Sequence, residues 1–570
     1  MFKLRSLLVL ALIIVSTYAW CPARSAESAT IDIVVQPVPR TELTAPPSHG
    51  LNSRSVMPRH FANPALIRQQ KELLASTRTK PSSEHGGHGK PTPSPTPTPT
   101  STPTPAPPVP ISQTGTSPTA VNLTGAFVGT GDTLYEPPDT QIAAGLNGST
   151  TELLEAVNLT GQVFSTSGTL LTTLNLSQLT IDPSTDSVSD PRVLYDAVSQ
   201  RWLILLITFS PTTDSGWDLA VSQTSDPSGG YNLYTISTAN VVNPDGTKGN
   251  FPDFPKIGFN GNKVVITGDA FHAIQKHSGT SYKFEGTEFV VLNKSELVSG
   301  DSSASAVMFL PDQGDLAIEP ALHLNPTSTP GVSPADNLYM AAVNGTLAST
   351  STIDVWTVTG VPGVSTVGAV RTSLPIGTLS IPPNAQQAGS GVLIDTNDDS
   401  LLDAVFRDGS IAGSLWVSAN DGCVPPSDSA VRSCLRFIEV SVGSGGTSGL
   451  SVSQDFDYAG QPGLYYYYPA LRTDSSGDLA TVFSGSSTSS FASVYSASRL
   501  VGDTANTLTN FSTIESGAAA YTTSPPRWGD YSGAGIDPDD STIWIGGEYA
   551  ASDNPILGSL WGTWIASVQP

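Results

Sequence analysis

From residue 111 to residue 570 the apolar residues occur in short runs, and this pattern restricts the chain to folds built from sheets. Runs such as Lys263–Gly268, Asn337–Val343 and Thr542–Gly547 are rich in β-branched and aromatic residues and are bounded by turn-forming residues. No long apolar stripe with helical spacing interrupts them. So many short strands predict either a pair of sandwiches or sheets repeated around an axis.

A degenerate internal repeat favours the radial arrangement. Most of its copies open with an acidic or aromatic residue beside a proline, followed by two apolar strands separated by a turn. The seven copies begin near Pro138, Asp190, Asp253, Glu319, Val392, Tyr468 and Asp530. We therefore predict an all-β chain forming a β-propeller of seven four-stranded blades, with six or eight blades as alternatives. A strand around Val121–Val128 is expected to pair with the last blade and close the ring.

The first 110 residues differ in composition from the rest. Lys3 and Arg5 precede the apolar run Leu7–Val15, and Ala23 and Ser25 suit a cleavage site, which predicts a secretory signal peptide at residues 1–25. Residues 26–110 are predicted to be disordered and to end in a Pro/Thr-rich linker at 91–110, a semi-rigid spacer. The propeller domain is predicted at 111–570. Because no second long apolar stretch follows, we expect a secreted protein with no membrane span.

Cysteine usage and charge both bear on the compartment and the partners. Cys21 leaves with the predicted signal peptide, so Cys423 and Cys434 are predicted to form one disulfide in an oxidising compartment. Residues 1–110 hold eleven of the 26 Lys and Arg residues and five of the 49 Asp and Glu residues, so residues 111–570 carry a net charge of −29. A domain this acidic repels phosphate backbones, and nucleic acid is not expected as a partner.

Five motifs carry a resemblance to a known group of proteins. They are Asp190–Asp196, Arg201-Trp202, Asp226-Pro227, Phe251–Gly258 and Arg527–Tyr531. With these motifs, residues 120–565 resemble the sialidase-like propeller proteins that bacteria secrete. The resemblance implies the fold, but a shared propeller implies no chemistry by itself. The sequence also departs from true sialidases, because Thr212–Trp217 places tryptophan two positions early for an Asp-box and the Arg-Ile-Pro motif is absent.

The segment from Asp395 to Asp403 has the spacing of a short calcium loop. Oxygen-bearing side chains stand at its positions one, three, five and nine, which are Asp395, Asn397, Asp399 and Asp403. Alternate side chains in a tight turn converge, and Ca²⁺ takes six to eight oxygen ligands. The alternative is an Asp/Asn turn between strands that needs no metal. Calcium is the one cofactor that the sequence suggests.

A second candidate site comes from residues that open the repeats. Inner strands of a propeller line its channel, so these residues are expected to meet at one rim and to raise one another's pKa values. The carboxylates are Asp139, Asp190, Asp253, Glu319 and Asp530; the cations expected beside them are Arg192, Lys256, Arg472 and Arg527, and Tyr468 is a further candidate. The alternative is structural, since Asp-Pro is common in turns and the carboxylates can accept backbone hydrogen bonds.

Three functions remain open on this sequence. The first is a secreted binding module that recognises an extracellular glycan or protein through one face of the propeller. The second is a sialidase-like glycoside hydrolase or lyase that uses rim carboxylates as acid and base. The third is a structural envelope or matrix protein without a ligand. Whether the chain is an enzyme is left open by the sequence.

Overall fold

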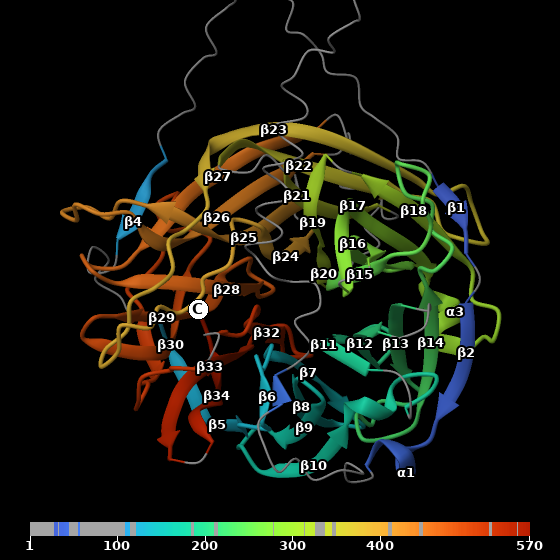
Figure 1. Cartoon of the computed structure of the whole chain (residues 1–570), viewed down its shortest axis with the longest axis horizontal. Coiled ribbons are helices and arrows are strands. Elements are labelled where there is room, and N and C mark those ends of the chain that lie inside the picture. Colours follow the sequence, from blue (N-terminus) through green and yellow to red (C-terminus); the bar gives the residue numbers. More distant parts are fainter. Residues whose placement is uncertain are drawn as a thin grey trace, which may run out of the picture.

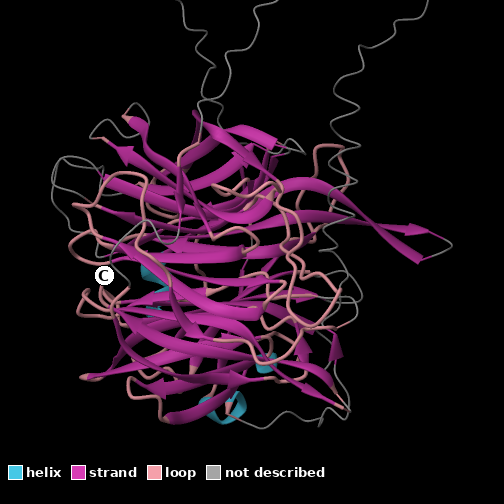
Figure 2. Cartoon of the chain, turned by 90° about the vertical axis from the view of Figure 1, so that its left-hand side faces the viewer, coloured by secondary structure: helices cyan, strands magenta, loops and turns pink. Residues whose placement is uncertain are grey.

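The computed structural model describes residues 28–31, 33–44, 55–56, 109–113, 121–183, 187–209, 215–276, 279–312, 314–324, 337–344, 349–408, 413–443, 449–523, 527–555 and 557–570. The predicted signal peptide and residues 91–108 of the predicted linker lie outside these ranges. Strands dominate what is described (Figure 2), and helical turns there are confined to α1 (Arg40–Leu43), η1 (Leu176–Gln178) and α3 (Lys294–Ser299). No helix in these ranges is long and apolar enough to cross a membrane.

The strands form seven sheets of four to six strands around a central axis, together with one two-stranded sheet (Figure 1). The strands nearest the axis are β7 (Gln141–Asn147), β11 (Ser187–Asp196), β15 (Phe251–Phe259), β19 (Asp315–Pro320), β24 (Leu401–Arg407), β28 (Tyr465–Thr473) and β32 (Gly533–Ile536), with β20 (Leu322–Leu324) parallel to β24 on its inner side. The prediction of an all-β propeller is confirmed.

Antiparallel strands lead outwards from each inner strand. They are β8 (Thr150–Val157), β9 (Thr160–Ser165) and β10 (Leu170–Asn175); β12 (Arg201–Phe209), β13 (Gly216–Ser222) and β14 (Tyr231–Ser237); β16 (Lys263–Lys276), β17 (Gly279–Asn293) and β18 (Ala306–Asp312); β21 (Leu338–Asn344), β22 (Ser349–Thr359) and β23 (Gly368–Ser380); β25 (Gly413–Cys423), β26 (Arg432–Val442) and β27 (Leu450–Ala459); β29 (Leu479–Ser487), β30 (Ser490–Arg499) and β31 (Ser512–Glu515); and β33 (Ile543–Asn554) and β34 (Gly558–Val568). Each sheet packs against a neighbour on both faces, so a strand such as β29 is buried at every residue.

The ring closes through a strand from the beginning of the domain. β5 (Leu123–Gly131) pairs antiparallel with β34, with Leu123 opposite Val568. This pairing covers the edge of the last sheet and joins the two ends of the propeller. The closing strand expected around Val121–Val128 is therefore confirmed.

Residues ahead of the predicted domain boundary also belong to the sheets. β1 (Ser28–Thr30) pairs with β18, and β2 (Ile33–Val38) pairs with β14 over six residues, so both extend outer edges of the ring (Figure 1). β3 (Ser55–Val56) runs parallel to β6 (Tyr135–Glu136). The prediction that residues 26–110 are disordered is wrong for these strands. Short polar strands of this kind carry little periodic signal in the sequence.

Four inner strands contain a bulge near their first residues, and these bulges position the candidate site. Each bulge holds a residue with positive φ: Asp190 (53°), Phe254 (57°), Ala317 (47°) and Tyr468 (56°). Left-handed backbone is uncommon for residues other than glycine, and a bulge changes the direction of the side chains that follow. The first residues of these inner strands look equivalent in the sequence, but the bulges turn side chains at different positions of each strand towards the channel.

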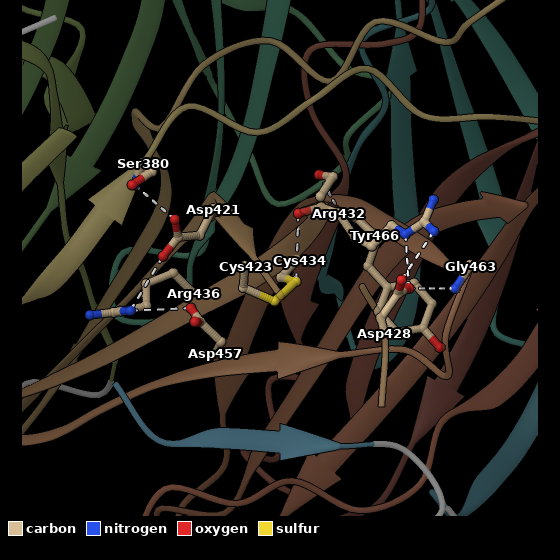
Figure 3. Close-up of a disulfide and its surroundings, with 11 residues drawn as sticks. Ser380, Asp421, Cys423, Asp428, Arg432, Cys434, Arg436, Asp457, Gly463 and Tyr466 are labelled. Carbon is tan, nitrogen blue, oxygen red and sulfur yellow. Dashed lines mark hydrogen bonds and ion pairs between the residues drawn. A yellow bond between two sulfur atoms is a disulfide. The ribbon is translucent and has the colours of Figure 1, made fainter. Parts of the chain in front are cut away.

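One disulfide joins neighbouring strands of a single sheet (Figure 3). Cys423 at the end of β25 is bonded to Cys434 of β26, as the sequence predicts. Beside it the fully buried Arg436 forms ion pairs with Asp421 at 3.3 Å and with Asp457 at 3.1 Å. Asp421 also accepts a hydrogen bond of 2.8 Å from the backbone N–H of Ser380 in β23, and this bond ties the sheet to the preceding one.

Candidate functional site

Four of the predicted rim carboxylates lie together at the channel end where the inner strands begin, which we call the mouth. We call Asp139, Asp190, Asp253 and Asp530 the acid cluster; all but the half-buried Asp190 are buried. Asn158 joins two of them, because its Nδ2 donates to Asp139 Oδ2 at 2.7 Å and its Oδ1 accepts from the Asp190 backbone N–H at 3.0 Å. The Asp530 backbone N–H donates to Asp139 Oδ1 at 2.8 Å. Three sheets thus contribute to one hydrogen-bonded group.

Burial and mutual repulsion raise the pKa values of three members of the acid cluster, Asp139, Asp253 and Asp530. Burial raises the pKa of Asp139 and of Asp253 well above the usual range, and the charge on Asp190 raises both further. Burial also raises the pKa of Asp530 to about 6, although the Arg527 guanidinium opposes this shift. A buried carboxyl that keeps its proton can donate a hydrogen bond as well as accept one.

Arg527 is the cation embedded in this cluster. Its Nη2 forms an ion pair with Asp530 Oδ2. Although burial lowers it, the pKa of Arg527 is raised overall by the carboxylates of Asp530 and Asp139. Its charge is therefore largely neutralised within the protein.

A pocket opens beside the acid cluster. Its empty space is about 400 Å³ when the open solvent at its entrance is included, and we call it the mouth pocket. Its lining is Asp253, Phe254, Asp269, Phe271, Leu316, Asn397, Asp398, Ser400, Arg527 and Asp530. Asp253 is 6% exposed, and its Oδ2 is buried without a hydrogen-bond partner. Such an oxygen either carries a proton or needs a donor that the protein does not supply.

Two cations and two aromatic rings cross the channel next to the mouth pocket. The guanidinium carbon of Arg192 lies 3.6 Å from the centre of the Tyr531 ring, and Tyr531 stacks on Phe254 with ring centres 5.0 Å apart. Lys256 Nζ lies 4.6 Å from the centre of the Phe254 ring. We call these four residues the ring stack. Because the sheets of β7 and β11 separate those of Tyr531 and Phe254, this contact spans the channel.

A second set of charges belongs to other predicted site residues. Lys256 Nζ pairs with Glu319 at 2.7 Å, and Arg472 Nη1 pairs with Asp403 at 2.6 Å. Lys256 also donates to the carbonyl of Leu401. Glu319 therefore contacts one of the predicted cations, Lys256, and not an aspartate of the acid cluster. The cations expected to receive an anionic group already have carboxylate or aromatic partners.

The predicted calcium loop forms part of the mouth. Asp395 Oδ1 accepts from the Asn397 backbone N–H at 3.0 Å, and Asn397 has a positive φ of 55°, as in an Asx turn. Asp399 is 8% exposed, whereas Asp403 accepts from Arg472 and, at 2.8 Å, from the Leu471 backbone N–H. Among the described residues, no group of three or more His, Cys, Asp and Glu side chains has an arrangement suited to a metal ion. Calcium binding by this loop stays a prediction.

Tyr468 is buried and connects two segments of the mouth through hydrogen bonds. Its hydroxyl donates to the Asp395 carbonyl at 3.1 Å, and its backbone N–H donates to Asn420 Oδ1 at 2.7 Å. Burial raises the pKa of this phenol well above its usual range. Its hydroxyl is thus held by a backbone group rather than by a catalytic base.

The structure adds residues that sequence reasoning missed. Asn158 bridges two acid-cluster members, Asp269 lies opposite Asp253 in the sheet, and Phe254 and Tyr531 form the centre of the ring stack. Phe254 and Tyr531 each stand directly after a predicted aspartate, so this adjacency was the available signal. Asn158 and Asp269 carry no local signal, because their roles depend on pairing between strands.

Comparisons with known proteins return similar solved structures, whereas no protein-family model and no curated protein sequence matches the chain. Trypanosoma rangeli sialidase in complex with sialic acid is 9% identical at a TM-score of 0.31, over 78% of this chain and 59% of that one. The same enzyme with the inhibitor DANA gives 9% and 0.30, over 71% and 57%. An exo-β-1,3-galactanase from Clostridium thermocellum gives 10% and 0.27, over 78% and 100%.

The similar structures thus include sialidases, in agreement with the resemblance of the sequence motifs to sialidase-like propeller proteins. The chain spans less than two thirds of those sialidase chains. At these identities and TM-scores, the likeness carries no inference about activity. The sheets and the mouth themselves define the class of protein, a β-propeller with an acidic, aromatic-lined pocket at one end of its channel.

Proposed function

We propose that this protein is a secreted β-propeller that binds an extracellular glycan in the mouth pocket. One observation carries the proposal: the pocket combines carboxyl groups from separate segments of the chain with the rings of Phe254 and Phe271. Sugars present hydroxyl donors and apolar ring faces. Pockets for small ligands pair aromatic walls with a few fixed polar groups, and this pocket has both.

The unpartnered oxygen of Asp253 supports ligand binding over a purely structural role. A carboxylate that serves only the fold is expected to have all its buried oxygens hydrogen-bonded, because an unsatisfied one costs about 1–3 kcal/mol. Asp139, by contrast, has a partner at both oxygens. We infer that Asp253 Oδ2 receives a hydrogen bond from the ligand.

Glycoside hydrolysis is a second candidate, favoured by a separate observation. Asp253 and Asp530 line the same pocket, and burial raises the pKa of both, to about 6 for Asp530. A pair of carboxyl groups with different pKa values can serve as acid and as base or nucleophile. In this mechanism Asp253 would hold the proton and Asp530 would act as the carboxylate.

A glycan array probed with the mature chain tests the proposed function, and chromogenic glycosides test the second candidate. We expect Asp253→Asn to reduce glycan binding at least tenfold. Asp503→Asn removes an exposed carboxylate of a turn after β30 and is the matched control. Absence of any glycan bound by the wild-type chain would contradict the proposal. Turnover lost in both Asp253→Asn and Asp530→Asn would favour the enzyme.

We also propose that each of the seven sheets with four or more strands is one blade. Contacts between successive inner strands support this, from β7 with β11 round to β32 with β7. A count of six, which the sequence left open, would require two adjacent sheets to act as one blade. An electron-density map of the ring would distinguish seven blades from six.

A further inference from the structure

Lys256 and Glu319 bring an amine and a carboxyl group into contact where almost no solvent reaches them. Lys256 belongs to β15 and Glu319 to β19, which are inner strands of adjacent sheets. Lys256 Nζ lies 2.7 Å from Glu319 Oε2, and the two side chains are 0% and 6% exposed. An amine in its neutral form is a nucleophile, and the carboxyl carbon of Glu319 is the electrophile beside it.

The surroundings of this pair give little support to its ionised form. A buried ion pair offsets its loss of hydration only when the geometry is good and further hydrogen bonds satisfy both partners. Glu319 Oε2 is buried and has no partner with hydrogen-bond geometry, although Nζ is close to it. Burial lowers the pKa of Lys256 and raises the pKa of Glu319, and the attraction between the two charges opposes both shifts. Burial therefore favours a neutral amine beside a protonated carboxyl.

A second buried pair in the same chain shows the contrast. Lys294 Nζ lies 2.9 Å from Asp196 Oδ2, with the two side chains 6% and 2% exposed. Asp196 Oδ2 also accepts from Ser199 Oγ at 2.5 Å, and its Oδ1 accepts from the Val198 backbone N–H at 3.2 Å. These donors stabilise the carboxylate, so we expect this pair to remain ionic.

We propose that Lys256 and Glu319 condense after folding to an intramolecular amide that joins β15 to β19. Nζ of the neutral amine attacks Cδ of the protonated carboxyl. A C–N bond forms, the C–O bond to the carboxyl hydroxyl breaks, and this hydroxyl leaves as water with a proton from Nζ. The reaction needs no oxidant, cofactor or second substrate. The fold holds the two groups in contact, and the Leu401 carbonyl accepts a hydrogen bond from Nζ and restrains it. Burial then keeps water away from the product.

Mass spectrometry of the denatured protein tests the bond, because denaturant separates an ion pair and leaves an amide intact. We expect the mature wild-type chain, with its disulfide reduced, to be lighter by one water molecule than its sequence requires. Lys256→Arg replaces the amine by a guanidinium that stays charged, and this variant should have its full sequence mass. Lys294→Arg makes the same change in the comparison pair and should retain the loss of water.

Tryptic peptides of the wild-type chain locate the bond. The amide should block cleavage after Lys256 and give a branched peptide that contains both Lys256 and Glu319, whereas Lys294 and Asp196 should appear in separate linear peptides. These wild-type measurements carry the test if Lys256→Arg does not fold. A wild-type chain with its full sequence mass would overturn the inference, and so would a loss of water that maps to other residues.

Discussion

The guanidinium group of Arg192 lies over the ring of Tyr531, with the guanidinium carbon 3.6 Å from the ring centre. Arg192 comes from β11 and Tyr531 from the segment before β32, so residues 339 positions apart share one contact. The Tyr531 hydroxyl also donates to Asp190 Oδ2 at 3.2 Å. One side chain thus joins the ring stack to the acid cluster.

Two replacements of Tyr531 separate the contribution of its ring to stability from the contribution of its hydroxyl group. Tyr531→Phe removes only the hydroxyl and should lower the free energy of unfolding by about 1 kcal/mol. Tyr531→Leu also removes the ring between Arg192 and Phe254 and should cost about 2–4 kcal/mol. Urea unfolding followed by tryptophan fluorescence measures both. Equal losses in the two variants would show that the ring adds nothing beyond its hydroxyl.

The buried carboxyl group of Glu288 predicts that the stability of the fold depends on pH. It is fully buried in β17, with Asn250 Nδ2 donating to Oε2 at 2.9 Å, and burial raises its pKa to about 8. Since the folded pKa exceeds the ordinary value, this group contributes full stability at low pH. That contribution is lost as pH rises from about 4.5 through about 8.

Glu288→Gln cannot ionise, so it should escape this loss. Between pH 5 and pH 8 its free energy of unfolding should rise relative to that of the wild type by about 1.4 kcal/mol per pH unit, and the difference should level off above pH 8. Urea unfolding at a series of pH values measures the difference. Parallel curves for the two proteins would assign the titration to another group.

A variant that breaks the ion pair of Asp403 with Arg472 distinguishes a structural role of Asp403 from calcium binding. The pair is largely buried, so Asp403→Asn should lower the free energy of unfolding by about 3 kcal/mol. If the pair is the sole role of Asp403, the loss is the same in 1 mM calcium chloride and in EDTA. A loss that appears only with calcium would instead make Asp403 a metal ligand.

Removing the disulfide tests the stability of the β25–β26 hairpin. Cys423 and Cys434 are 11 residues apart, and a bridge across so short a loop is worth about 2–3 kcal/mol. Cys423→Ala combined with Cys434→Ala should lower the melting temperature by several degrees while the circular dichroism spectrum is retained. Dithiothreitol should lower the wild-type melting temperature to that of the variant and leave the variant unchanged. An unchanged melting temperature in the variant would contradict this value.

The architecture was predictable because its signals are local. Each strand carries its own alternation and turn residues, and Asp139, Asp190, Asp253 and Asp530 could be placed at one rim from repeat starts alone. The bulges were not predictable. In its own bulge, Asp190 is itself the residue with left-handed backbone, whereas Asp253 comes one residue before the left-handed residue and Glu319 comes two residues after it. A shift of this size decides which side chain faces the channel.

Contacts between segments that are distant in the sequence could not be predicted from it. The stacking of Tyr531 on Phe254 depends on how the ring closes, and the pairing of Ser28 with Phe309 depends on an N-terminal segment returning to an outer edge. Neither is encoded in a periodic pattern. The spacing predicts Asp403 as the last ligand of a loop, and it gives no sign of the ion pair with Arg472, which comes from another sheet.

The edge strands at the N-terminus attach the chain to the ring on both sides of the residues that the structure leaves undescribed between them. β1 and β2, which are residues 28–30 and 33–38, pair with two different sheets, and β4 (Ile111–Gln113) runs parallel to β27. Both ends of the intervening chain are thus fastened to the same body. A load applied to the chain between Leu43 and Ile111 would therefore fall on β2, β3 and β4, and through β2 and β4 on the outer edges of the ring.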